Sequence, residues 1–212
     1  MLKSYYLLLK PGILFGNLIT MSAAFVLGSQ GLFDPYLLLA SLLGLLCVIG
    51  SACVFNNCID RRSDAKMERT KNRPLVRGKI SLQSALFFGA MLTLFGFWVL
   101  AYYTNWIAFS SALIGWLIYV IFYSLGKYRS ALAVWVGAVA GATPPLVGYC
   151  AASDCLDGGA LLLFLLLLFW QMAHFFSIAI FRLDEYKAAD IPVFPLEKGM
   201  QATKVHMLIY IG

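Results

Sequence analysis

The chain has 212 residues, of which 61% are hydrophobic and 12% are charged, and its formal net charge at pH 7 is +6. A soluble domain carries about 25% charged residues, about twice the fraction of this chain. The composition therefore excludes an ordinary soluble domain and indicates a protein that is embedded in a membrane.

The hydrophobic residues occur in blocks, and each block is near the ~20 residues that a helix needs to cross the hydrocarbon layer. A seventh run begins near Ala202 and reaches only to Gly212, so we expect C-terminal helices to be missing from the chain. The predicted fold is an all-α, polytopic transmembrane bundle that forms one domain over residues 1–212. The six complete blocks are 13–29, 36–58, 82–103, 106–125, 131–152 and 159–181.

All of the basic residues lie on one side of the predicted spans. The connections around 30–35, 104–105 and 153–158 contain no Lys or Arg. By the positive-inside rule, the N-terminus and the loops 59–81 and 182–201 are cytoplasmic. This distribution explains the net charge without a nucleic-acid partner, and the lack of an Arg-rich and Ser-rich transit segment favours a bacterial protein.

The end of the second block carries three oxygen-bearing side chains at a spacing of four residues. Because no Gly or Pro interrupts the helix, Asn56, Asp60 and Asp64 stack on one face. Two carboxylates and an amide suit Mg²⁺, which leaves further positions for water and phosphate. The alternative is a solvated helix end whose acids pair with Arg61, Arg62 or Lys66. Carboxylates at the hydrocarbon edge are costly and tend to be functional, so we favour the metal site.

A basic segment, MERTKNRPLVRGK, follows directly. Most of its charges are explained by membrane orientation or by contact with anionic lipid headgroups. Arg69 and Arg73, four residues apart and just before Pro74, are the two exceptions. Beyond a Mg²⁺ site, we predict that they neutralise a diphosphate.

Several segments resemble the UbiA-like intramembrane prenyltransferases and, more narrowly, the heme O synthase family within them. The resemblance covers the whole chain. The first signature of the superfamily is matched by Asn56-x-x-x-Asp60-x-x-x-Asp64 followed by RTKNRPL. The other matching segments are KPGILFGNLIT, YSLGKYR, GAVAGATPPLVGY and, as the ones that narrow the resemblance to the heme enzymes, WQMAHF and EYKAADIPVFP.

The resemblance implies a nine-helix bundle around a central cavity that opens to the cytoplasm, in a bacterial inner membrane. It implies Mg²⁺-dependent transfer of a farnesyl group from farnesyl diphosphate to a vinyl group of protoheme IX. Water captures the resulting cation, which gives heme O for terminal oxidases. We also weigh a prenyltransferase that acts on an aromatic quinone precursor, and a non-catalytic heme carrier or assembly factor. Prenyl chain length, metal count and oligomeric state stay open.

The resemblance also assigns roles to residues. The catalytic set is Asn56, Asp60, Asp64 and Lys127, and Tyr123 lies with Lys127 within reach of the same diphosphate. A second acidic cluster, formed by Asp184, Glu185 and Asp190, would share the metal. Asp184 and Asp190 are six residues apart rather than the usual four, and Glu185 stands where heme O synthases usually have Asp. Which of the three acids binds metal therefore stays open, and an ordinary charged loop is the alternative.

Two polar residues lie within the sixth block. His174 is eight residues before Arg182, or ~12 Å from the membrane boundary. Gln171 is three residues earlier and shares its face. Polar side chains at such depth face a cavity or the protein interior, and imidazole is a common ligand of heme iron. We predict that His174 and Gln171 contact heme, with His206 as a second candidate and interhelical hydrogen bonding as the alternative.

The fifth block contains Gly137, Gly141 and the pair Pro144-Pro145. The glycines are typical of close helix packing. The prolines must break or kink the helix, and such a break is tolerated where it lines protein or a cavity.

Overall fold

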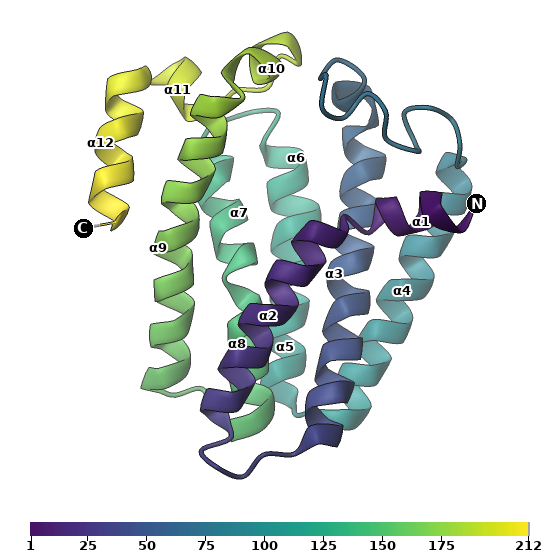
Figure 1. The fold of residues 1–212 in the computed structure, drawn as a ribbon, viewed down its shortest axis with the longest axis vertical. Helices are drawn as coiled ribbons and strands as arrows, with labels where there is room; N and C mark the ends of the chain where they lie inside the picture. Colours follow the sequence, from purple (N-terminus) through teal and green to yellow (C-terminus); the bar gives the residue numbers. More distant parts are fainter. Residues whose placement is uncertain (212) are drawn as a thin grey trace.

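The computed structural model describes residues 1–211, and within that range it contains helices and no strand (Figure 1). Gly212, the end of the predicted domain, lies outside the described residues. The helices are α1 (Leu2–Leu8), α2 (Pro11–Gly28), α3 (Pro35–Asp64), α4 (Leu82–Tyr103), α5 (Trp106–Leu117), the π-helical turn η1 (Ile118–Tyr123), α6 (Ser124–Gly126), α7 (Ala133–Gly141), α8 (Thr143–Ser153), α9 (Gly158–Phe181), α10 (Leu183–Ala188), α11 (Phe194–Glu197) and α12 (Met200–Ile211).

Six helical stretches are long and apolar enough to cross a membrane, and each corresponds to one predicted block. Four are the helices α2, α3, α4 and α9. The fourth span along the chain joins α5, η1 and α6, and the fifth joins α7 and α8. The all-α, multi-pass membrane fold is confirmed, and the seventh run forms α12.

Capping side chains mark where four of the spans begin. In each case the side-chain oxygen accepts from a backbone N–H of the first turn, which otherwise has no partner. The capping residues are Asp34 for α3, Ser81 for α4, Asn105 for α5 and Asp157 for α9.

Glycines set the closest helix contacts. A Cβ at Gly28 would lie 2.5 Å from the carbonyl oxygen of Tyr149, so α2 packs directly on the backbone of α8. In the same way, a Cβ at Gly96 would lie 2.9 Å from the carbonyl oxygen of Gly44, so α3 and α4 meet at these two glycines. Small residues at such contacts are the usual means of packing helices in a membrane.

The fifth span breaks where the prolines predict. Helix α7 ends at Gly141 and α8 begins at Thr143, with proline in its first turn. The close-packing role of the two glycines is confirmed in a particular form, because each is covered by a side chain. A Cβ at Gly137 would lie 2.8 Å from the ring of Tyr123, and one at Gly141 would lie 2.0 Å from Oε1 of Gln171.

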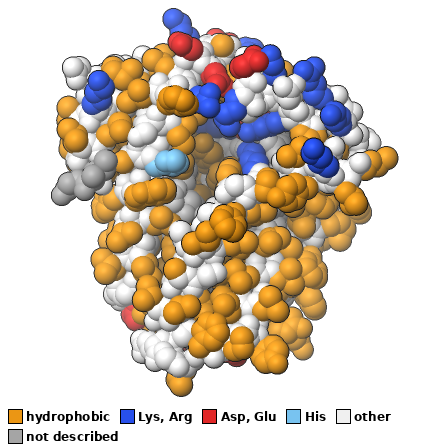
Figure 2. All heavy atoms as spheres, in the orientation of Figure 1, with side chains coloured by type: hydrophobic (Ala, Val, Ile, Leu, Met, Phe, Trp, Pro, Cys, Tyr) orange, Lys and Arg blue, Asp and Glu red, His pale blue; other side chains and the backbone are white. Residues whose placement is uncertain are grey.

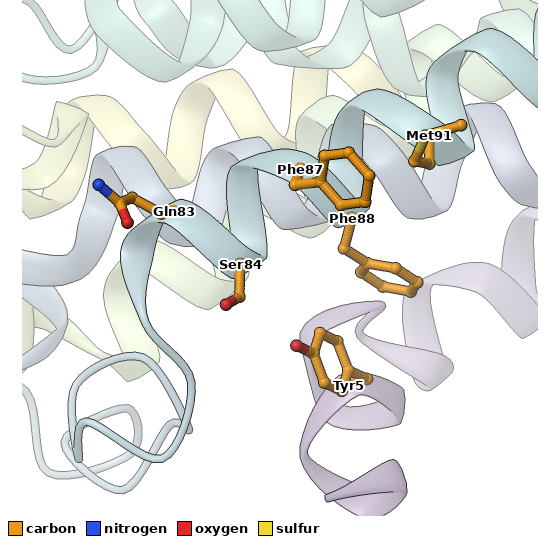
Figure 3. Close-up of a pocket in the computed structure, with 6 residues that line it drawn as sticks. All are labelled: Tyr5, Gln83, Ser84, Phe87, Phe88 and Met91. Carbon is orange, nitrogen blue, oxygen red and sulfur yellow. The ribbon is translucent and has the colours of Figure 1, made fainter.

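Helix α1 is too short to span a membrane and was not predicted. It lies against the start of α4, where the rings of Tyr5 and Phe88 meet edge to face at 5.1 Å (Figure 3). Asn57 of α3 holds the end of α1 by donating to the carbonyl of Leu8 at 2.8 Å. Helix α1 thereby fixes where the chain enters α2.

Candidate active site

A cavity of about 940 Å³ lies inside the bundle. Figure 2 shows a hollow in the upper part of the molecule, with Lys and Arg side chains beside it and hydrophobic side chains below. We call the charged end of this cavity the mouth. Of the residues that the sequence predicts to bind metal, diphosphate or heme, nine line the cavity: Asn56, Asp60, Asp64, Arg69, Arg73, Tyr123, Lys127, Gln171 and His174. The smaller pocket in Figure 3, of about 460 Å³, contains none of them.

Helix α3 supplies the acidic face of the mouth. It stays helical through Asp64, as predicted, so Asn56, Asp60 and Asp64 project to the same side. Their exposed fractions are 2%, 5% and 2%. Buried carboxylates require compensation by cations or hydrogen bonds, so the surroundings of these side chains determine their chemistry.

Both carboxylates are paired with cations from other segments. Asp60 accepts from Lys127 Nζ at 2.6 Å and from the Tyr128 hydroxyl at 2.7 Å. Asp64 accepts from Arg73 at 2.6 Å, and the hydroxyl of Thr70 donates to its backbone carbonyl. Pairing with Arg61, Arg62 or Lys66, the alternative considered from the sequence, does not occur in the described chain. Burial, together with the charge of Asp60, raises the pKa of Tyr128, so its hydroxyl stays a donor.

Lys10 is a member of the mouth that the sequence does not single out, because membrane orientation alone explains a lysine before the first span. It immediately precedes α2 with a left-handed backbone (φ 53°). Its Nζ donates to Oδ1 of Asn56, whose Nδ2 in turn donates to Ser124 at 3.0 Å. Burial, with the nearby charges of Arg73 and Lys127, lowers the pKa of Lys10 to about 8.

An aromatic wall continues the cavity below the mouth. The rings of Tyr119 and Tyr123 stack at 5.3 Å across the π-helical turn η1, and both line the cavity. One turn earlier, Trp116 is held by a 2.9 Å hydrogen bond from its Nε1 to Ser51. π-Helical turns are rare in proteins, and many of those that occur lie at functional sites. No pattern in the sequence predicts this one.

The second acidic segment covers the mouth from outside. Asp190 pairs with Lys66 at 2.7 Å and Glu185 pairs with Arg182 at 2.8 Å, while Asp184 is exposed. These three acids do not line the cavity, although their neighbours Arg182 and Tyr186 do. Within residues 1–211, no three His, Cys, Asp or Glu side chains are grouped closely enough to hold a metal ion. The shared metal site therefore stays a prediction.

The two histidines lie in different surroundings. His174 lines the cavity and its ring stacks on Trp170 at 5.1 Å. His206 does not line the cavity: its ring packs 4.8 Å from that of Phe194, and its Nδ1 is 2.9 Å from the carbonyl of Ala202. The geometry thus supports His174 rather than His206 as a ligand-contacting residue.

The donor set of the mouth fits a hard divalent cation. Two carboxylates and one amide share a face of α3, and five cations line the same cavity: Lys10, Arg69, Arg73, Lys127 and Arg182. Oxygen donors of this kind bind Mg²⁺, which takes one or two carboxylates and completes its shell with water and phosphate. The mouth can therefore receive a metal together with a multiply charged anion, above a largely apolar chamber.

Comparison with known proteins agrees with this geometry. Residues 17–212 match the model of the UbiA prenyltransferase family. A UbiA homologue from Archaeoglobus fulgidus, solved with DMAPP and Mg²⁺, superimposes with a TM-score of 0.84 at 18% identity, over 98% of this chain and 73% of that one. The same homologue with GPP and Mg²⁺ gives 0.81 at 17% identity, over 98% and 75%. The chain belongs to the UbiA prenyltransferase family.

Relatives of higher sequence identity indicate which group of prenyltransferases the chain resembles most. The chain is 51% identical to the protoheme IX farnesyltransferase of Protochlamydia amoebophila, over 100% of this chain and 75% of that protein. It is 48% identical to protoheme IX farnesyltransferase 1 of Shewanella frigidimarina, over 100% of this chain and 70% of that protein.

The Asp60–Lys127 pair leads to a prediction about stability. Lys127→Met leaves a buried carboxylate without its cation, so we expect the free energy of unfolding to fall by on the order of 3 kcal/mol. Thermal unfolding in detergent, with a chelator present, measures this effect. Adding Asp60→Asn removes the uncompensated charge and should restore most of the loss. A double variant as unstable as Lys127→Met would show that the pair does not govern stability.

Proposed function

We propose that the protein transfers a farnesyl group from farnesyl diphosphate to a vinyl group of protoheme IX, with addition of water, and so forms heme O for terminal oxidases. The observation that carries this proposal is the 51% identity to a protoheme IX farnesyltransferase across the entire chain. The cavity supports it, because about 940 Å³ is at the upper end of the usual size of ligand sites, about 300–1,000 Å³.

The mouth is the site for the diphosphate. Asp60 and Asp64, assisted by Asn56, would hold Mg²⁺, which when bound supplies positive charge for the departing diphosphate. Lys127 and Arg73 now pair with those carboxylates, so both lie where they can turn to the phosphates. Arg69 and Lys10 add two further cations. Such a set of fixed charges stabilises the leaving anion as the bond to the prenyl carbon breaks.

The wall below the mouth suits the cation that ionisation leaves. Tyr119 and Tyr123 present aromatic rings to the cavity, and ring faces attract cations. The apolar surroundings exclude bulk water, which would otherwise capture the allylic cation before the vinyl group does. His174 of α9, which lines the same cavity, would contact the porphyrin.

The protein acts in the bacterial inner membrane, with its N-terminus and both acidic segments on the cytoplasmic side. The charged side chains in Figure 2 gather at the upper end of the molecule, above a hydrophobic body. An excess of Lys and Arg marks the cytoplasmic side of a membrane protein. Farnesyl diphosphate and heme would reach the mouth from that side.

An aromatic acceptor is the second candidate and is not favoured. The curated relatives are named for heme, and the cavity-lining imidazole of His174 suits heme better than a phenol. A heme carrier without catalysis leaves the buried acids and cations of the mouth without a role.

The reaction itself is testable in membranes that contain the protein, supplied with heme, farnesyl diphosphate and Mg²⁺. Mass spectrometry of the extracted hemes should reveal a species heavier by one farnesyl group plus water. Asp60→Asn should abolish it, because the mouth loses a metal-binding carboxylate while the Tyr128 hydroxyl still has a partner. Unchanged heme from folded wild-type protein would exclude heme as the acceptor.

Lys10 should make substrate binding dependent on pH. In the free protein its pKa is about 8 because of burial, so above pH 8 it is mostly neutral. A bound diphosphate favours the charged form, so binding at pH 9 should take up a proton and weaken as pH rises. Calorimetry of farnesyl diphosphate binding in two buffers of different ionisation enthalpy measures the uptake. Lys10→Met should abolish the uptake and Lys3→Met, at an exposed position, should not; equal uptake in both variants would contradict the assignment.

Glu185 is the acid of the second segment that we propose to reach the metal. Arg182 binds its Oε1, whereas its Oε2 is buried with no hydrogen-bond partner among the described residues. Glu185→Gln should raise the Mg²⁺ concentration for half-maximal activity by roughly tenfold or more. Asp184→Asn, at the exposed neighbour, is the matched control. A larger effect at Asp184 would reverse the assignment.

A further inference from the structure

Gln171 carries a polar group that nothing in the described protein satisfies. The side chain is 8% exposed and lines the cavity from α9. Neither its amide oxygen nor its amide nitrogen has a hydrogen-bond partner within residues 1–211. The amide therefore faces the cavity, where ordered water or a ligand can satisfy it, as is normal for polar groups that lack a protein partner.

The amide of Gln171 lies at the break between α7 and α8, and we call this position the seat. A Cβ at Gly141 would lie 2.0 Å from Oε1 of Gln171 and 2.9 Å from its Nε2, so only glycine leaves room. Pro145 has no N–H to donate to the carbonyl of Gly141, four residues earlier. At the preceding carbonyl, that of Ala140, the Thr143 hydroxyl donates instead at 2.8 Å. An amide, a hydroxyl and a carbonyl that lacks its helical donor therefore collect at one turn.

The chemistry of this seat suits water better than a charged group. Leu167, Pro144 and Trp170, which also line the cavity, are apolar, and His174, three residues later on α9, is the polar residue on the same face. Of the cations that line the cavity, Arg182 at the end of α9 is the one on this helix, eleven residues or ~16 Å beyond Gln171. The others precede α7 in the chain and lie at the mouth, so a heme propionate beside Gln171 would have no adjacent counter-charge. A neutral molecule that both donates and accepts, to a carbonyl and from an amide N–H, matches the groups present.

We propose that Gln171 positions the water molecule that completes the reaction, an inference that rests on the proposed function. Attack by the vinyl group forms a carbon–carbon bond to the farnesyl carbon as diphosphate leaves, and a cation remains on the vinyl carbon next to the porphyrin. The oxygen of the held water bonds to that carbon. One water proton departs with the diphosphate, which the first step has released as a base. No oxidant or reductant is required.

Without a held water, the same cation would lose a proton and form an alkene. The test is therefore the ratio of two farnesylated hemes, one with the added water and one lighter by that water, resolved by mass spectrometry. Gln171→Leu should raise the water-free fraction on the order of tenfold, the effect of one lost hydrogen bond on competing steps. Gln171→Glu, which keeps a polar group at the seat, should return the ratio toward wild type.

Two further variants separate positioning from general damage. Leu166→Ala removes an exposed side chain of α9 that does not line the cavity, and it should leave the ratio unchanged. Gly141→Ala keeps Gln171 but displaces its amide, so it should shift the ratio as Gln171→Leu does; it also decides the matter if Gln171→Leu gives no product. An unchanged ratio in Gly141→Ala and Gln171→Leu would overturn the inference. Absence of both products in the wild type would instead overturn the proposed function.

Discussion

Two ion pairs hold the mouth of the cavity together, and most of the site depends on them. Asp60 and Asp64 lie one turn apart on α3 and are nearly fully buried. Without cations, their like charges would repel one another in an environment where water screens them little. Lys127 and Arg73 supply the compensation from the end of the fourth span and from the loop after α3. Charge balance thus joins segments that lie far apart in sequence.

The same balance explains how a substrate-free site can be both stable and ready. Both carboxylates have a cationic partner, and each member of these pairs suits a second role, the carboxylates toward a metal and the cations toward phosphate. Exchange of partners lets a diphosphate with Mg²⁺ enter without leaving an uncompensated buried charge. The acids of the second segment follow the same principle, since Glu185 and Asp190 are also held by cations.

Below the mouth, backbone irregularities shape the chamber. The π-helical turn stacks Tyr119 on Tyr123, and the proline break between α7 and α8 leaves the carbonyl of Gly141, the glycine that the Gln171 amide contacts, without its helical donor. Gly137 lets the ring of Tyr123 lie against α7, and Gly141 does the same for the amide of Gln171. In a membrane such irregular backbone is tolerated only where it faces protein or a cavity, and here it faces the cavity.

Local sequence patterns determined the membrane spans and the acidic face of the site. Block length and hydropathy specified six spans, and the spacing of Asn56, Asp60 and Asp64 specified one face, because both depend only on helical geometry. Tertiary structure alone decided which cations meet those acids, brought Lys10 to Asn56, and separated His174 from His206. These outcomes depend on how the helices pack and where loops cross the mouth. Contacts between residues far apart in the chain leave no periodic signal in a single sequence.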